Sequence, residues 1–314
     1  MCPERISIIV NNAINIGKVT ASGTVGGINN ASIKVKVKVK VKVKVKVKIK
    51  IKIKIKAPKL SGKMCYSVAY LEKKQSRLIE RYKNMLPPEW KDPIHPKNKL
   101  DQLPEYYFLS AFTHPELPIV TGEGIRMKEW GLIPFWVKDE EKGTKIRKGT
   151  LNAVGETVFE KPSYRSIIRS KRGLLPVSGF FEWRDYNGKK YPYYIRLKDH
   201  DLFSLACIFD SWINKQSGEI IESFSVMTTP ANTMMEAIHN RKKRMPLILS
   251  LEKEKEWIGN HLNEQEVLEL IKPFDSNRME AYPVSRRLNY SGNNRNTPEA
   301  IQKKNYPELP VIQS

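Results

Sequence analysis

The chain has 314 residues, of which 40% are hydrophobic and 28% are charged, as is ordinary for one large globular domain or two small ones. Its formal net charge of +22 is concentrated at one end, because residues 1–63 contain sixteen basic side chains and one acidic one, for a net charge of +15. The other 251 residues carry +7, which is compatible with a phosphate-binding face but does not demonstrate one.

The three cysteines, Cys2, Cys65 and Cys207, are widely spaced. This spacing argues against a disulfide framework and against a zinc site, so we expect a reducing compartment, no metal and no other cofactor. The sequence contains neither an apolar run long enough to span a membrane nor a recognisable signal peptide. We therefore expect a cytoplasmic protein with no membrane partner.

Residues Ile33–Lys56 alternate strictly between a β-branched residue and lysine, with seven Val-Lys pairs followed by four Ile-Lys pairs from Val35 onward. This alternation would give a strand with one apolar and one cationic face, but the segment far exceeds the usual ~3–10 residues of a strand. Three interpretations remain open: a start codon assigned upstream of the true one, a disordered tail, and a basic arm for nucleic acid or anionic lipid. We expect residues 1–63 to be a low-complexity extension and residues 64–314 to be the folded domain.

Hydrophobic periodicity predicts the elements of this domain. In chain order they are a strand at Cys65–Tyr70, a helix within Glu72–Met85, strands at Tyr106–Phe112 and Ile125–Ile133, a helix at Ser163–Ser170, strands at Gly173–Trp183, Tyr191–Leu197, Leu202–Trp212 and Glu222–Thr228, and helical stretches within Thr233–His239 and Leu251–Ile271. Asn187-Gly188 and Ser217-Gly218 predict turns between strands. Because βαβ alternation is absent, we predict a strand-rich α+β fold with a few peripheral helices.

The Met64-Cys65 pair has a distinctive chemistry if translation starts at Met64, because an initiator methionine before cysteine is removable. Cys65 would then carry a thiol and a free α-amine on adjacent carbons. The α-amine has a pKa near ~8, so part of it is unprotonated at neutral pH and can condense with an aldehyde. The neighbouring thiol can close the resulting imine to a thiazolidine in an intramolecular step. The alternative is a buried core cysteine, which is the commoner role of a lone cysteine.

Three further polar clusters lie in apolar surroundings. Glu182 lies in Gly179–Trp183 (GFFEW), where flanking aromatics would raise the pKa of its carboxyl and suit it to acid–base chemistry. The alternative is that Glu182 points outward from its strand to solvent. His239 (in AIHN) could shuttle protons or be a surface or capping histidine, and Asn152 (in LNAVGET) could be part of a polar turn.

The order of the motifs is more specific than any one of them. The motifs are Met-Cys, WGLIPFW (130–136), LNAxGET, FEKPSYR (159–165), GFFEW, IHN…RMP and PVS (283–285). Together they resemble the SRAP family, the SOS-response-associated peptidase-like or abasic site processing proteins, from Met64 to about Asn296. The resemblance implies a strand-rich α+β fold, a positively charged groove for single-stranded DNA and a role in the DNA damage and SOS response.

The resemblance also implies roles for individual residues. Cys65 would be the nucleophile that forms a thiazolidine crosslink with the aldehyde of a ring-opened abasic site. Asn152 would orient the reacting groups, Glu182 would assist ring opening, and His239 would assist proton transfer and crosslink reversal. An autopeptidase activity that removes the residues ahead of Cys65, and a lyase activity, are further expectations of the same origin.

Two positions depart from the pattern of the family. Val154 stands where many members have an arginine, so phosphate binding would be weaker, and Cys65-Tyr66-Ser67 replaces the common Cys-Gly-Arg. We predict DNA contacts by Trp136 through base stacking, which Phe135 could share, unless these aromatics belong to the core. Further predicted DNA contacts are Arg165, Arg169, Arg244 and Ser285, and other candidates for phosphate binding are Lys171, Arg172, Arg241, Lys242 and Lys243, although each charge could simply be solvated.

The leading hypothesis is a cytoplasmic, nucleoid-associated monomer that captures abasic sites in single-stranded DNA covalently and without a cofactor. Two alternatives remain open. One is a module that binds single-stranded DNA without a covalent bond. The other is a cysteine peptidase that acts on other proteins through a Cys65–His239 pair and an oxyanion site.

Overall fold

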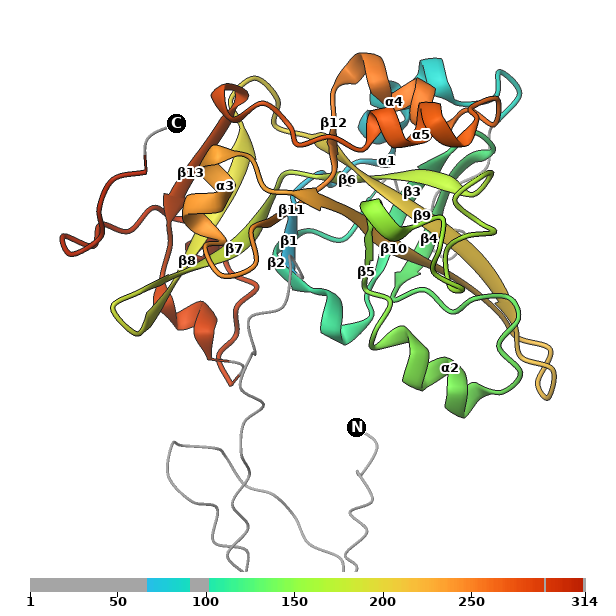
Figure 1. Cartoon of the computed structure of the whole chain (residues 1–314), viewed down its shortest axis with the longest axis horizontal. Coiled ribbons are helices and arrows are strands. Elements are labelled where there is room, and N and C mark those ends of the chain that lie inside the picture. The colour runs from blue at the N-terminus through green and yellow to red at the C-terminus, as the bar shows by residue number, and fades with distance from the viewer. Residues whose placement is uncertain (1–66, 91–101, 291, 313–314) are drawn as a thin grey trace, which may run out of the picture. The chain divides into compact units, whose positions relative to one another are not determined.

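The computed structural model describes residues 67–90, 102–290 and 292–312 (Figure 1). The strands are β1 Ser67–Tyr70, β2 Tyr106–Ser110, β3 Glu116–Thr121, β4 Gly124–Trp130, β5 Asn152–Val154, β6 Arg172–Val177, β7 Gly179–Tyr186, β8 Lys189–Leu197, β9 Phe203–Ile213, β10 Ile220–Pro230, β11 Arg244–Pro246, β12 Ile248–Leu249 and β13 Met279–Pro283. The helices are α1 Gln75–Tyr82, α2 Glu140–Arg147, α3 Thr233–Ile238, α4 Leu251–Ile258 and α5 Glu264–Leu270. The predicted strand-rich α+β fold is confirmed, whereas the predicted extension at residues 1–63 lies outside the described residues.

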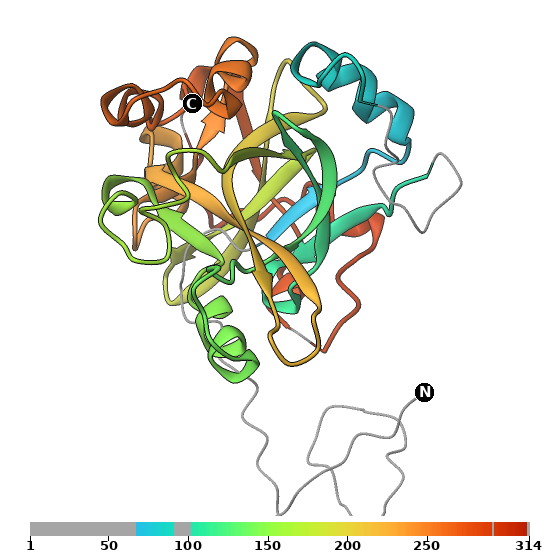
Figure 2. The ribbon, with the colours of Figure 1, turned by 90° about the vertical axis from the view of Figure 1, so that its right-hand side faces the viewer.

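Two sheets organise the domain. The first is antiparallel throughout, in the order β13-β8-β7-β1-β2. The second runs β10-β4-β3-β6-β9 and closes on itself because β9 also pairs with β10, as the side view in Figure 2 helps to follow. The short strands β5 and β11 pair with β10, and β12 pairs with β9. The strand β10 therefore links most elements of the second sheet.

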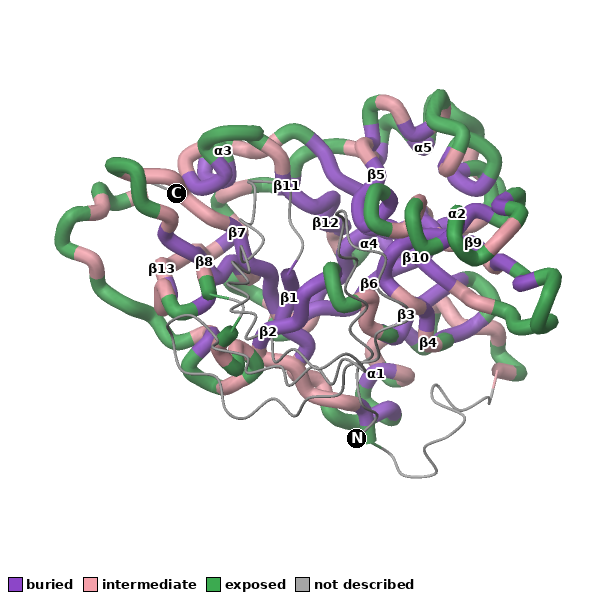
Figure 3. Tube along the Cα trace, turned by 90° about the horizontal axis from the view of Figure 1, so that it is seen from below, coloured by how far each residue is buried: buried purple, intermediate pink, exposed green. Residues whose placement is uncertain are grey.

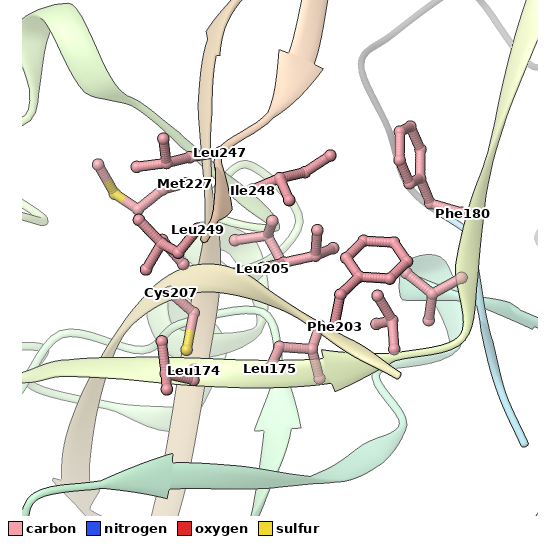
Figure 4. Close-up of a cluster of buried hydrophobic side chains, with 14 of the residues drawn as sticks. Leu174, Leu175, Phe180, Phe203, Leu205, Cys207, Met227, Leu247, Ile248 and Leu249 are labelled. Atoms are coloured by element: carbon pink, nitrogen blue, oxygen red, sulfur yellow. The ribbon is translucent and has the colours of Figure 1, made fainter. Parts of the chain in front are cut away.

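The main core is made by side chains from both sheets. Figure 4 shows part of it, in which Phe180 of β7 approaches Phe203 of β9 beside leucines of β6 and β9. Figure 3 shows how burial varies along the chain: buried residues follow the central strands, and exposed residues lie mainly in the loops and on parts of the helices. Burying each large apolar side chain stabilises the fold by ~1.5–3 kcal/mol. Cys207 lies in this core, fully buried, and burial raises the pKa of its thiol far above the ordinary value.

Two predicted elements are wrong. The predicted strand Gly173–Trp183 is two strands, one in each sheet, separated at Ser178, whose N–H donates to the carbonyl of Ala69. The predicted helix Ser163–Ser170 is a series of turns, because its hydrogen bonds alternate between three- and four-residue spacing. The hydroxyl of Tyr164 also donates to the carbonyl of Asn152, so a tertiary contact fixes this segment.

None of the described helices is long and apolar enough to cross a membrane.

Candidate active site

Glu182 faces the interior of the domain. Phe180 and Glu182 lie on the same face of β7 because side chains alternate along a strand, and Phe180 belongs to the core between the sheets (Figure 4). Glu182 is only 2% exposed, so the alternative of an outward-facing carboxylate is wrong. Gly179, on the opposite face of β7, permits close packing there, because an added Cβ would lie 2.4 Å from the ring of Tyr194.

Burial raises the pKa of Glu182 from 4.5 to about 8, against the opposing effects of the Trp183 backbone N–H and the positive charge of Lys190. Its Oε1 atom is buried and makes no hydrogen bond within the described part of the chain. A carboxyl with this pKa is mostly protonated at neutral pH. The predicted elevation of the pKa is therefore confirmed, and Glu182 can donate a proton.

His239 lies directly against Glu182 at the end of α3. Its Nδ1 is 2.8 Å from the carbonyl oxygen of Arg244 and 3.9 Å from Oε1 of Glu182. Because a carbonyl only accepts, Nδ1 carries the hydrogen and Nε2 is left as a proton acceptor. Burial lowers the pKa of His239, and the charges of Lys242 and Arg244 act in the same direction. The pair is therefore a protonated acid beside a neutral imidazole, and not a salt bridge.

Asn152 begins β5 and is buried, with its backbone opposite Val226 of β10. The strand β10 continues toward α3, which carries His239 at its C-terminal end. Asn152 and His239 are thus both attached to β10, whereas Glu182 comes from the other sheet. A direct contact is seen for Glu182 and His239, and the orienting role of Asn152 stays a prediction.

Cys65 lies outside the described residues, which begin at Ser67, the first residue of β1. The strand β1 pairs antiparallel with β7, with Val68 opposite Phe180 and Ala69 opposite Gly179. In this register, residues later in β7 lie toward the start of β1. Glu182 follows Phe180 by two residues, so it lies toward the end at which the chain enters β1.

Comparison with known proteins settles the family. Residues 64–291 match the family model described as SOS response associated peptidase (SRAP). The chain belongs to the SRAP family. It is 41% identical over 175 residues to the abasic site processing protein YoqW of Bacillus subtilis (strain 168), covering 55% of this chain and 74% of that protein. It is 31% identical over 192 residues to the abasic site processing protein HMCES of Xenopus tropicalis, covering 55% of each.

The fold of the SRAP domain also has a counterpart among solved structures. A crystal structure of a protein from Bacteroides thetaiotaomicron matches with a TM-score of 0.69 and 40% sequence identity, covering 76% of this chain and 100% of that one. The predicted family and fold are therefore both confirmed.

The predicted DNA-binding residues of the SRAP domain differ in how they are held. Trp136 and Phe135 are 45% and 57% exposed, so they are not core residues. Arg165 is also exposed, whereas Arg169 is paired with Glu264. The other predicted contacts are half-buried: Arg244 binds both carboxylate oxygens of Glu156, and Ser285 accepts a hydrogen bond from the N–H of Arg287. Their contacts with DNA stay predictions.

Arg172 is wrong as a candidate for phosphate binding. It is 2% exposed, and its guanidinium donates to the carbonyls of Ile168, Arg169, Trp257 and Gly259. Its charge is therefore used inside the fold. Three other candidates form ion pairs: Lys171 with Asp210, Arg241 with Asp185, and Lys243 with Glu236, while Lys242 is exposed.

Sequence reasoning missed three residues beside Glu182 and His239, namely Asp185, Lys190 and Asn240. Lys190 of β8 lies opposite Asp185 of β7, and the charge of Lys190 affects the pKa of both Glu182 and His239. The two-residue Asn187-Gly188 turn could have indicated this register, because it fixes which residues of the hairpin face each other. Asn240, which binds the backbone of Asp185, stands within the IHN motif itself.

Proposed function

We propose that this chain captures abasic sites in single-stranded DNA as a covalent thiazolidine with Cys65, as part of the DNA damage response. The observation that carries the proposal is the buried pair of Glu182 and His239, a protonated acid 3.9 Å from a neutral imidazole. Glu182 lies on β7, the strand with which β1 pairs, and Cys65 precedes β1 by two residues. The naming of the relatives as abasic site processing proteins supports abasic sites as the target.

The chemistry balances without an oxidant or a reductant. The ring-closed abasic sugar is a hemiacetal; when its C1′–O4′ bond breaks, Glu182 donates a proton to O4′ and a base such as Nε2 of His239 takes the proton of the C1′ hydroxyl. The α-amine of Cys65 then adds to the aldehyde and water leaves, giving an imine. The thiol adds to the imine carbon, its proton passes to the nitrogen, and the thiazolidine closes. General acid–base help of this kind is worth ~10²–10⁴-fold in rate.

The reach of the chain supports Cys65 as the nucleophile. Two residues of extended chain span at most ~7 Å, so Cys65 stays near the start of β1 wherever its side chain points. Where β1 pairs with β7, the first residues of β1 lie nearer to Glu182 than its last residues do. Cys207, in contrast, is fully buried in the core, where its thiol cannot reach a DNA strand.

We propose that exposed groups around the loop 131–138 bind the DNA strand. Phe135 and Trp136 expose flat apolar rings, and base stacking on such rings is worth ~1–3 kcal/mol per base. The loop is held in place because the carboxylate of Asp210 accepts the N–H of Phe135 at 2.8 Å. Arg165 and the half-exposed Lys171 are the proposed phosphate contacts. Val154 lacks the arginine charge and is expected to lower affinity.

We further propose that the α-amine of Cys65 is exposed by removal of Met64 or by autocleavage of a longer chain, which is the peptidase activity that the family name suggests. Intact mass of the protein from its native cells should correspond to residues 65–314. A stable species that retains the Lys repeat would contradict removal of this segment.

The test is covalent capture on a denaturing gel. The described residues belong to one compact unit that excludes residues 1–59, so the protein can be expressed from Met64. It should form an adduct with a single-stranded oligonucleotide containing one abasic site that survives detergent and heat. Cys65→Ala should abolish the adduct and Cys65→Ser should not restore it, whereas Cys207→Ala should keep it.

Three outcomes would contradict the proposal. An adduct that needs Cys207 and not Cys65 would show that the nucleophile is wrong. Binding that is lost on denaturation would favour the module that binds single-stranded DNA without a covalent bond. Cleavage of other proteins that needs Cys65 and His239, without any DNA adduct, would favour the cysteine peptidase.

A further inference from the structure

The side chain of Asn240 joins the two segments that carry Glu182 and His239. Asn240 directly follows His239, and Asp185 lies three residues after Glu182 on β7. Nδ2 of Asn240 donates to the carbonyl of Asp185 at 2.8 Å, and its Oδ1 accepts the N–H of Asp185 at 3.2 Å. The side-chain amide thus uses both backbone groups of one strand residue, much as a neighbouring strand would.

A second connection reinforces the first. Nε of Arg241 lies 2.7 Å from Oδ2 of Asp185, although the side chain of Arg241 is largely exposed, so this ion pair contributes little by itself. The loop then folds back, because the N–H groups of Lys242 and Lys243 both donate to the carbonyl of His239. Lys243 has a φ of 51°, in the left-handed region that a lysine rarely adopts.

We propose that Asn240 and Asp185 form a clasp that holds His239 beside Glu182, which makes Asn240 a positioning residue for the reaction of the abasic sugar. The inference rests on the proposed function for the reaction that the clasp serves. Besides the clasp, His239 is held by the end of the six-residue helix α3, by its bond to Arg244 and by the N–H groups of Lys242 and Lys243. The clasp connects it directly to the strand that carries the acid.

The charges around the pair explain why a tight connection matters. Lys190 of β8, Lys242 of the loop and Arg244 of β11 all place positive charge near His239, and Lys190 also acts on Glu182. Burial opposes the charge of Lys190 and keeps the carboxyl of Glu182 protonated. If the loop moved away and water entered, the pKa of Glu182 would fall toward its ordinary value and the acid would be lost.

Asn240→Ala removes both hydrogen bonds of the clasp and tests the proposal. In the wild type, the rate of crosslinking should decline above about pH 8, because Glu182 loses its proton there while the α-amine of Cys65, with a pKa near ~8, gains little more reactivity. In Asn240→Ala, the midpoint of this decline should move down by at least ~1 pH unit, which leaves roughly fivefold less protonated acid at about pH 8. The α-amine of Cys65 titrates in the same way in both proteins, so a difference between the two pH profiles reports the titration of Glu182.

A second readout needs no reaction. Nitrogen NMR of the His239 ring should show the Nδ1–H tautomer in the wild type, because Nδ1 donates to the carbonyl of Arg244. In Asn240→Ala the two tautomers should average and the ring should titrate closer to its ordinary value. This measurement remains informative if the wild type forms no DNA adduct, in which case the proposed function fails and the clasp is judged alone.

Asn296→Ala is the matched control. Its Oδ1 accepts the N–H groups of Tyr107 and Phe108, so this substitution also removes two side-chain-to-backbone bonds, but on β2. It should lower the melting temperature by a similar amount while leaving the pH profile and the His239 tautomer unchanged. The clasp is overturned if Asn240→Ala behaves like this control, or if it leaves both readouts as in the wild type.

Discussion

Replacing Glu182 with glutamine keeps the shape of the buried side chain and removes its proton. The folded protein holds this proton up to about pH 8, whereas an ordinary carboxyl loses it near 4.5. Between these values the folded state binds more protons than the unfolded state. The stability of the wild type is therefore undiminished below about pH 4.5 and falls as the pH rises toward 8, by up to ~1.4 kcal/mol per pH unit.

Glutamine does not titrate, so Glu182→Gln should escape this loss. The difference in unfolding free energy between the variant and the wild type should grow by roughly 3 kcal/mol from about pH 5 to about pH 7.5. The titration of His239 is common to both proteins and largely cancels in the difference. Urea unfolding at each pH measures the quantity directly. Glu116→Gln is the control, because Glu116 is an exposed strand carboxylate.

The same substitution should slow crosslinking to abasic DNA by ~10²–10⁴-fold, because no proton can be donated to the opening sugar. Binding to single-stranded DNA should be unchanged. The variant would thus be relatively more stable at neutral pH and less active. If the stability difference is independent of pH, Glu182 is not held protonated by burial. If crosslinking keeps the wild-type rate with unchanged binding, the acid role is refuted.

Four other outcomes are expected. His239→Ala should accumulate adduct that transfers slowly to fresh competitor DNA in a chase experiment, and equal transfer rates would contradict a role in reversal. Arg172→Ala should lower the unfolding free energy by at least ~3 kcal/mol, because it leaves buried carbonyls without a donor, whereas the exposed Arg165→Ala should change it by ~0.5 kcal/mol or less. Trp136→Ala should weaken binding of single-stranded DNA by ~1–3 kcal/mol in a titration without lowering the melting temperature. EDTA should leave adduct formation unchanged on the gel, and a loss that added metal restores would contradict the proposed chemistry.

The fold was predictable from sequence where elements are long and locally specified. The long strands β9 and β10 contain stretches in which apolar residues follow one another or alternate with polar ones. The Asn187-Gly188 turn has positive φ at both residues, as a two-residue hairpin requires. The helix α2 was missed although the sequence contains two signals for it: Asp139 caps its N-terminus, and basic residues lie in its last turn. The short strands β5, β11 and β12 had none, since each is defined by a partner far away along the chain.

The site was predictable as a set of residues but not as an arrangement. Alternation along β7 places Glu182 on the face of Phe180, but only the packing of two sheets shows that this face is interior. The clasp joins Asn240 to a residue 55 positions earlier, a non-local contact that no local pattern reveals. The guanidinium of Arg172 shows the converse, because a charge in the sequence does not tell whether backbone carbonyls inside the fold will bind it.

The most direct test of the central claim is mass spectrometry of the adduct. The peptide that begins at Cys65 should carry the abasic sugar with the loss of one water, and its sulfur should resist iodoacetamide because the thiazolidine occupies it. Cys207 in the same denatured sample should be alkylated, which serves as the internal control. A sugar attached to any other residue, or an adduct at Cys65 whose thiol remains free to react, would contradict thiazolidine capture.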